Sequence, residues 1–96
     1  MGYKVVLSQR AIEDLAGIVL YIAENDPQAA VRFGNSLIDH AQQLSEFPRL
    51  GRPVRKRRGV RQLTHAPYLI FYSVNNSNRS IEVLRFWHAA RGEPDL

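Results

Sequence analysis

The residues with the clearest chemical potential form a basic cluster just beyond the middle of the chain. Residues 47–81 carry eight lysine and arginine side chains and no aspartate or glutamate. The planar guanidinium of arginine matches phosphate or carboxylate groups with two parallel hydrogen bonds. We therefore expect an anionic partner, either nucleic acid or an acidic protein segment, although a solvated loop that only aids solubility would look the same. The binding residues that we expect are Arg52, Arg55, Lys56, Arg57, Arg58, Arg61 and Arg85.

Catalysis without a metal is a second possibility for part of this set. His88 ends a predicted strand that also carries Arg85, and Arg61 precedes both in the basic region. A histidine that moves protons, with guanidinium groups that stabilise developing negative charge, can support metal-free RNA cleavage. The simpler interpretation of His88 is a packed or hydrogen-bonded residue at the end of a strand.

Other kinds of site find no support in the residue pattern. His40, His65 and His88 are 25 and 23 residues apart, so no two of them share the short spacing of a local metal motif, and the chain has no cysteine. Gly51 and Gly59 flank arginines and do not open a helix, which argues against a phosphate-binding loop. We expect no metal and no cofactor, and we place His40 at a helix surface.

The elements that position these residues begin with two helices. Residues 3–7 are β-branched and apolar, which predicts a strand, and Ser8 then offers a helix N-cap. Apolar residues recur at helical spacing after Ser8, and Asp26 with Pro27 marks the start of a second helix that ends by residue 47. Such a pair predicts an antiparallel helical hairpin over about residues 9–47.

The second half of the chain predicts a sheet. Residues 48–59 are rich in proline, glycine and arginine, which predicts a positively charged loop over this whole stretch. Three strands are expected within residues 60–88. The order β-α-α-β-β-β predicts an α+β fold, with the hairpin and the N-terminal strand packed on one face of a small antiparallel sheet. The core residues that we expect are Leu7, Leu15, Ile18, Ile22, Phe33, Leu37, Leu44, Leu63, Ile70, Tyr72, Val83 and Leu84.

Size and composition limit what this fold can contain. The 96 residues suffice for a single domain, spanning residues 1–96, and the apolar fraction of 45% with 23% charged residues excludes disordered and collagen-like classes. No apolar run is long enough to span a bilayer and no leader sequence opens the chain, so we expect a soluble, cytoplasmic protein without a membrane partner.

The ordered residues carry a resemblance to a known family. The first half has apolar positions around Asp14 and Tyr21, then Asp26-Pro27 and Phe33; the second has Pro48, Gly51-Arg52, Gly59-x-Arg61-x-Leu63, Tyr68-x-Ile70-x-Tyr72 and Leu84-Arg85-x-x-His88-x-x-Arg91. Taken in this order, they resemble the ParE/RelE superfamily of type II toxin–antitoxin toxins, also described as plasmid-stabilisation proteins. The resemblance covers nearly the whole chain and implies the same β-α-α-β-β-β arrangement.

The resemblance implies two alternative targets. ParE-like toxins poison DNA gyrase and have no established chemical step, whereas RelE-like toxins are ribosome-dependent endoribonucleases that cut messenger RNA. The Gly51-Arg52 link and the Gly59-x-Arg61-x-Leu63 strand look like ParE proteins. RelE-type nucleases commonly carry an arginine where Leu69 stands here, and several use a tyrosine that the tail after His88 lacks. We therefore favour a gyrase poison.

The resemblance also implies a protein partner. A cognate antitoxin would cover the toxin and neutralise it, so the arginines would meet antitoxin carboxylates as well as the cellular target. If the nuclease alternative holds, the resemblance makes Arg61, Arg85 and His88 the catalytic residues and the ribosome with its mRNA the partner. A third alternative is a harmless, basic module that binds nucleic acid with steep salt dependence.

Overall fold

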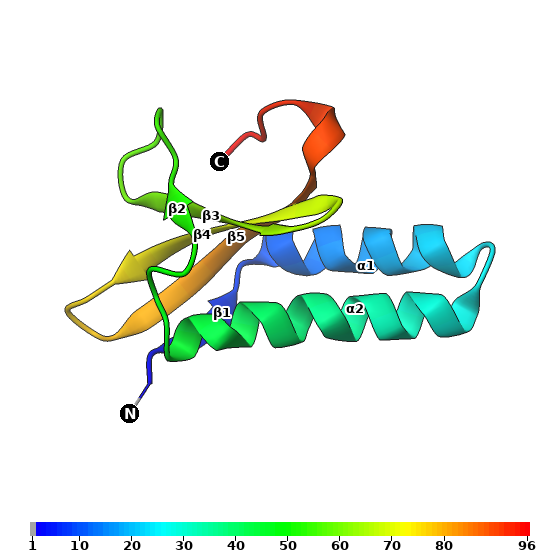
Figure 1. Ribbon diagram of the computed structural model, residues 1–96, viewed down its shortest axis with the longest axis horizontal. Coiled ribbons are helices and arrows are strands. Elements are labelled where there is room, and N and C mark those ends of the chain that lie inside the picture. Colours follow the sequence, from blue (N-terminus) through cyan, green and yellow to red (C-terminus); the bar gives the residue numbers. More distant parts are fainter. Residues whose placement is uncertain (1) are drawn as a thin grey trace.

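Two antiparallel helices cover one face of a five-stranded sheet, as the computed structural model shows (Figure 1). The structure describes residues 2–96. The helices are α1 (Gln9–Ala23) and α2 (Pro27–Gln42), and α2 continues into the 3-10 turn η1 (Gln43–Ser45). The α+β fold expected from the sequence is confirmed.

Both helices start where the sequence places an N-cap. The Ser8 hydroxyl accepts a hydrogen bond from the backbone N–H of Ala11 at 3.0 Å, and the Asp26 carboxylate accepts one from Ala29 at 3.0 Å. Each cap satisfies an N–H group that has no partner within its helix, which typically stabilises a helix by about 1 kcal/mol. Pro27 occupies the first turn of α2, where its missing N–H costs nothing.

The sheet is mixed, which differs from the antiparallel sheet that we expected. Its order is β1-β5-β4-β3-β2, with strands β1 (Lys4–Leu7), β2 (Arg52–Pro53), β3 (Val60–His65), β4 (Tyr68–Asn75) and β5 (Ser80–His88). The N-terminal strand β1 does not pack on the sheet but belongs to it, because it pairs in parallel with β5. The other three pairings are antiparallel. The short edge strand β2 lies inside the stretch that we expected to be a loop.

The main core lies between the helices and the sheet. Every core residue expected from the sequence except Leu84 either belongs to this cluster or packs against it. Gly34 of α2 allows the helices to approach closely, since a β-carbon there would lie 2.9 Å from the Val19 side chain of α1. Gly17 has no such neighbour within 4 Å, so only one of the two helical glycines marks a close approach.

A second, smaller cluster covers the outer face of the sheet, on the side away from the helices. Val60, Phe71 and Trp87 form its buried centre, and Leu84 packs against them. Leu84 follows Val83 of the main core, so the alternation of side chains along a strand places it on this outer face. β5 carries one extra residue at this point, since Phe71 pairs with Arg85 and Tyr72 pairs with Val83. The C-terminal residues curl over the same face (Figure 1).

Within residues 2–96, neither helix combines the length and the apolar character that a membrane span requires.

Candidate functional site

The basic cluster sits on a tight hairpin between β2 and β3, which we call the basic loop (residues 54–59). The N–H of Val54 donates to the carbonyl of Val60 at 2.8 Å, and Val60 donates to Arg57 at 3.2 Å, so the loop is closed by its own backbone. Gly59 has φ of 81°, a conformation that glycine adopts without strain. The hairpin therefore presents Arg55, Lys56, Arg57 and Arg58 to solvent.

The C-terminal residues contact two of these cations. Arg57 donates a hydrogen bond to the backbone oxygen of Leu96 at 2.7 Å, and the Lys56 ammonium lies 3.6 Å from Glu93. Arg52, Arg55 and Arg58 are also exposed, and none of the ion pairs described within residues 2–96 involves them. These three guanidinium groups remain available to an anionic partner.

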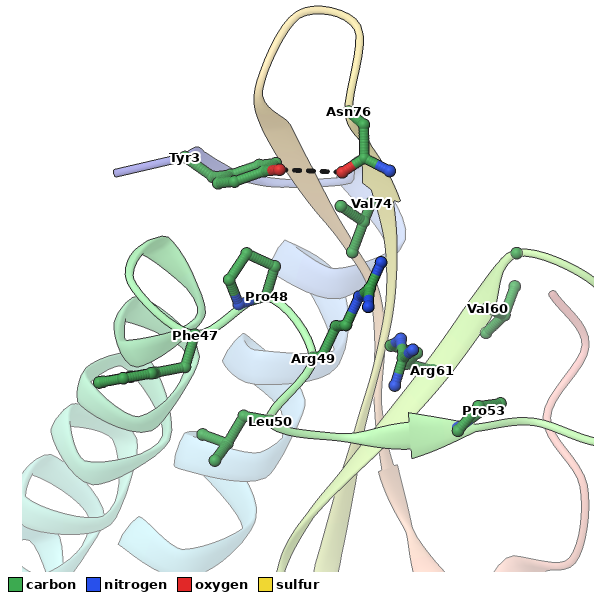
Figure 2. Close-up of a pocket in the computed structure, with 11 residues that line it drawn as sticks. Tyr3, Phe47, Pro48, Arg49, Leu50, Pro53, Val60, Arg61, Val74 and Asn76 are labelled. Atoms are coloured by element: carbon green, nitrogen blue, oxygen red, sulfur yellow. Dashed lines mark hydrogen bonds between the residues drawn. The ribbon is translucent and has the colours of Figure 1, made fainter. Parts of the chain in front are cut away.

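Arg61 lies apart from the loop, in a cleft on the helix-bearing side of the sheet. Its guanidinium donates to the backbone oxygen of Gly51 at 2.7 Å. We call this hollow the Arg49–Arg61 cleft; it has a volume of about 710 Å³. Figure 2 shows Arg49 and Arg61 in its middle. Its other lining residues include Tyr3, Phe47, Pro48, Leu50, Pro53, Val74 and Asn76.

A buried tyrosine fixes the segment that forms one wall of this cleft. The Tyr72 hydroxyl donates to the Pro48 carbonyl at 2.8 Å and accepts from the Gly51 N–H at 2.9 Å. Burial raises the pKa of Tyr72 above its ordinary value, although the hydrogen bond from Gly51 and the nearby Arg61 act in the opposite direction. Tyr72 therefore serves as a neutral clamp between the core and the cleft.

Arg85, which we expected to bind the target, is engaged inside the protein. It forms a two-point ion pair with Asp14 of α1, with nitrogen–oxygen distances of 2.6 and 2.9 Å, and its side chain is only 10% exposed. The hydrogen bond to Asp14 raises the pKa of Arg85. Arg85 also donates to the Asp95 backbone oxygen at 3.2 Å. These contacts give it a structural role.

His88 is likewise held by its neighbours. Its Nδ1 accepts a hydrogen bond from the Ala90 N–H at 3.1 Å, and its ring meets the edge of the Tyr68 ring at a centroid distance of 5.1 Å. The β4 partners of Arg61 and His88 are four residues apart, which corresponds to about 13 Å along a strand. Arg61, Arg85 and His88 are thus not assembled into one site.

A pair of histidines that was not expected from the sequence links α2 to β3. His40 on α2, which we expected to be a surface residue, has its Nδ1 2.8 Å from Nδ1 of His65 on β3. The Ser36 hydroxyl donates to the Phe33 carbonyl at 2.7 Å and lies 3.1 Å from Nε2 of His65. The serine oxygen must therefore accept from His65 Nε2–H, which leaves Nδ1 of His65 to accept from His40.

The environment of this pair favours a neutral His65. Burial, and then the proximity of His40, lower the pKa of His65 below its ordinary value. The pair has no third potential metal ligand beside it: within residues 2–96 no three His, Asp or Glu side chains are grouped to hold a metal. A hydrogen-bonded link between α2 and β3 accounts for the positions of both histidine rings. The signal in the sequence was only that His40 falls one helical turn after Ser36 on α2.

Two solved structures share the fold of this chain. The chain superposes on a chain of the chromosomal ParDE toxin–antitoxin system from P. aeruginosa with a TM-score of 0.78 and 23% identity, over 90% of this chain and 95% of that one. It also superposes on a chain of the toxin–antitoxin complex RelBE2 from Mycobacterium tuberculosis with a TM-score of 0.68 and 24% identity, over 92% and 99% of the two chains. The arrangement of one strand, two helices and four further strands is thus the toxin fold of these complexes.

Sequence relatives define the family. The chain is 33% identical to Toxin RelE1 and 36% identical to Toxin RelE2, both of Caulobacter vibrioides, over 92% of this chain and 95% and 97% of those proteins. Residues 5–92 match the family described as the ParE toxin of the type II toxin–antitoxin system parDE. The chain belongs to this family and is a type II toxin of the ParE/RelE superfamily.

Proposed function

We propose that this toxin poisons DNA gyrase, that it does so through the basic loop, and that a cognate antitoxin protein neutralises it. The observation that carries the proposal is the exposure of Arg52, Arg55 and Arg58 on and beside a hairpin closed by its own hydrogen bonds. Cations on a rigid element bind an anionic surface with little ordering cost. The complex of gyrase with cleaved DNA offers such a surface in its phosphates.

The positions of the potential catalytic residues support a binding role over a chemical step. General acid–base catalysis needs its groups within hydrogen-bond reach of one reacting centre. Arg85 is occupied by Asp14, and His88 lies about four residues along β4 from the position of Arg61. Leu69, which stands where nuclease members of the superfamily commonly carry arginine, packs instead into the outer cluster with Phe71.

A gyrase cleavage assay tests the proposal. Purified toxin is incubated with gyrase, relaxed plasmid and ATP, and linear DNA is scored after detergent and protease treatment. We expect linear DNA to increase with toxin concentration. The double variant R55A/R58A should need about tenfold more toxin for the same effect, because it removes two charges that contact the anionic target.

The control variant is K4A/R32A, which loses the same charge from the exposed residues Lys4 and Arg32 of β1 and α2. It should match the unmodified toxin. Equal losses in the two double variants would mean that only net charge matters. Absence of linear DNA from a toxin that still arrests cell growth would reject gyrase as the target.

The ribosome is the second candidate target, because two relatives bear RelE names. In that case mRNA from translating ribosomes would show cuts near codons that persist when EDTA is present, and His88→Ala would abolish them. The two assays give opposite results for the two targets.

A further inference from the structure

The proposed contact through the basic loop leaves the Arg49–Arg61 cleft without a role. One lip of the cleft exposes two large apolar side chains, Phe47 at 58% and Leu50 at 45%. The two residues are joined by a turn in which the Leu50 N–H donates to the Phe47 carbonyl at 3.0 Å. Large apolar side chains grouped at an open hollow are typical of a binding surface.

The charge of the cleft is entirely positive. Arg49 and Arg61 are the charged residues that line it, and no carboxylate does so among the residues that the structure describes. The bond to Gly51 holds Arg61 in place, and Figure 2 shows Tyr3 and Asn76 at one end of the cleft and Leu50 and Pro53 at the other. The cleft therefore complements a ligand that carries both carboxylates and an apolar group.

The wall of the cleft is rigid before any ligand arrives. Tyr72 ties Pro48 and Gly51 to the buried sheet, and Arg49 and Leu50 lie between those two anchored residues. A preformed wall lowers the entropic cost of binding.

The nature of the wall favours a peptide over a nucleic acid. Single-stranded nucleic acids bind through aromatic platforms on which successive bases stack. Of the two aromatic residues that line the cleft, Tyr3 already has the Arg79 guanidinium over its ring at 4.8 Å from the centroid, so Phe47 does not belong to a series of stacking platforms. Much of the remaining wall is proline and aliphatic, formed by Pro48, Leu50, Pro53 and Val74. Such a surface accepts a branched apolar side chain.

We propose that the Arg49–Arg61 cleft is the docking site for an acidic segment of the antitoxin. Carboxylates of that segment pair with Arg49 and Arg61, and an apolar side chain packs on Phe47 and Leu50. The antitoxin and the cellular target then contact different arginines of the toxin. This inference rests on the toxin–antitoxin assignment and does not depend on gyrase being the target.

The test measures two quantities for each variant of the full chain: the affinity for the antitoxin and the toxin concentration needed to poison gyrase. The cognate antitoxin is titrated by isothermal calorimetry at physiological salt, and the gyrase assay is run alongside. We expect R49E and F47S each to weaken antitoxin binding by about tenfold or more and to leave gyrase poisoning unchanged. The variant R55E should show the reverse pattern.

Matched controls separate this effect from net charge and from misfolding. R32E reverses one exposed charge on α2, outside the cleft and the loop. It should change neither antitoxin affinity nor gyrase poisoning. L50S provides a second apolar variant of the lip. Because Phe47, Arg49 and Leu50 are all exposed, these substitutions should leave the thermal unfolding temperature within a few degrees of the unmodified value.

Three results would overturn the proposal. The first is normal antitoxin binding by both R49E and F47S. The second is loss of gyrase poisoning by R49E with antitoxin binding intact, which would assign the cleft to the target. The third is a 20-nucleotide single-stranded DNA that binds the chain and is released by F47S but not by R55E. A further outcome is that neither the unmodified toxin nor any variant acts on gyrase, while R49E and F47S still weaken antitoxin binding and R55E does not. That outcome would support the docking site and reject gyrase as the target.

Discussion

Arg85 and Asp14 form a buried ion pair that joins strand β5 to helix α1. The same carboxylate also accepts a hydrogen bond from the Phe86 N–H at 3.2 Å. Asp14 thus satisfies both a guanidinium and a backbone donor of β5. A single carboxylate in this position completes the hydrogen bonding of the strand and fixes the helix against it.

Replacing Arg85 should therefore destabilise the fold. Because R85A leaves the Asp14 carboxylate buried without its partner, we expect the free energy of unfolding to fall by about 3–5 kcal/mol. Urea unfolding followed by circular dichroism measures this. R10A serves as the control, since Arg10 makes only an exposed contact at 4.0 Å with Asp95 and should change stability little. An R85A protein of normal stability that had lost toxicity would instead make Arg85 a binding residue.

The His40–His65 pair predicts a dependence of stability on pH. The folded pKa of His65 lies below its unfolded value of 6.5, so between these two values the unfolded chain binds more protons. The contribution of neutral His65 to the free energy of unfolding should be fully present above pH 6.5. It should be lost as the pH falls below 6.5 towards the folded pKa.

Comparing urea midpoints at pH 8 and pH 5.5 tests this dependence. H65F removes the titrating group and should reduce the difference between the two midpoints. H40Q removes the neighbouring charge that lowers the His65 pKa and should reduce the difference in part. A chain whose midpoint changes equally with pH in all three forms would contradict the assignment.

Gly51 has no room for a side chain. An added β-carbon would lie 2.5 Å from the Gln62 carbonyl oxygen and 2.9 Å from the Tyr72 ring. Because the closest atoms belong to the backbone of β3, G51A should destabilise the protein by about 1–3 kcal/mol or more. The matched control is G17A, which meets nothing within 4 Å in the middle of α1 and should stabilise the protein by about 0.5–1 kcal/mol. Thermal unfolding of the two variants should move in opposite directions.

The Tyr72 clamp can be removed without changing the ring. Y72F leaves the Gly51 N–H without its acceptor inside the protein, which should cost about 1–3 kcal/mol. It also frees the wall of the Arg49–Arg61 cleft. We expect antitoxin binding by Y72F to weaken under conditions in which the protein is still fully folded. Unchanged affinity would mean that rigidity of the wall contributes nothing to binding.

Local signals in the sequence account for much of this fold. Ser8 and Asp26 cap the helices as expected, and the three strands expected within residues 60–88 are β3, β4 and β5. These features depend on near neighbours in the chain, such as an N-cap oxygen and an N–H three residues later. The basic cluster was expected in a loop after the second helix, but the short strand β2 that precedes it was not predicted, because its pairing with β3 leaves no local pattern in two residues.

Features that depend on distant residues were not predicted. The parallel pairing of β1 with β5 and the contact of His40 with His65 join elements whose relation no local pattern encodes. The contacts of Arg85 were not predicted either, because the extra residue at Leu84 changes the alternation of side chains along β5. The partner of Arg85, Asp14, lies 71 residues away.

The pairing of β1 with β5 has a consequence for synthesis of the toxin. Lys4 is the partner of Ser80, and Leu7 is the partner of Val83, so the first strand made must wait for the last. Such distant contacts delay folding until β5 has been made. While the ribosome is still translating, strand β5, which lies between β1 and β4, is missing, and α1 lacks the strand against which it packs. A newly made toxin molecule therefore completes its fold only after β5 has left the ribosome, and an antitoxin present in the cell can meet the finished fold only from that moment.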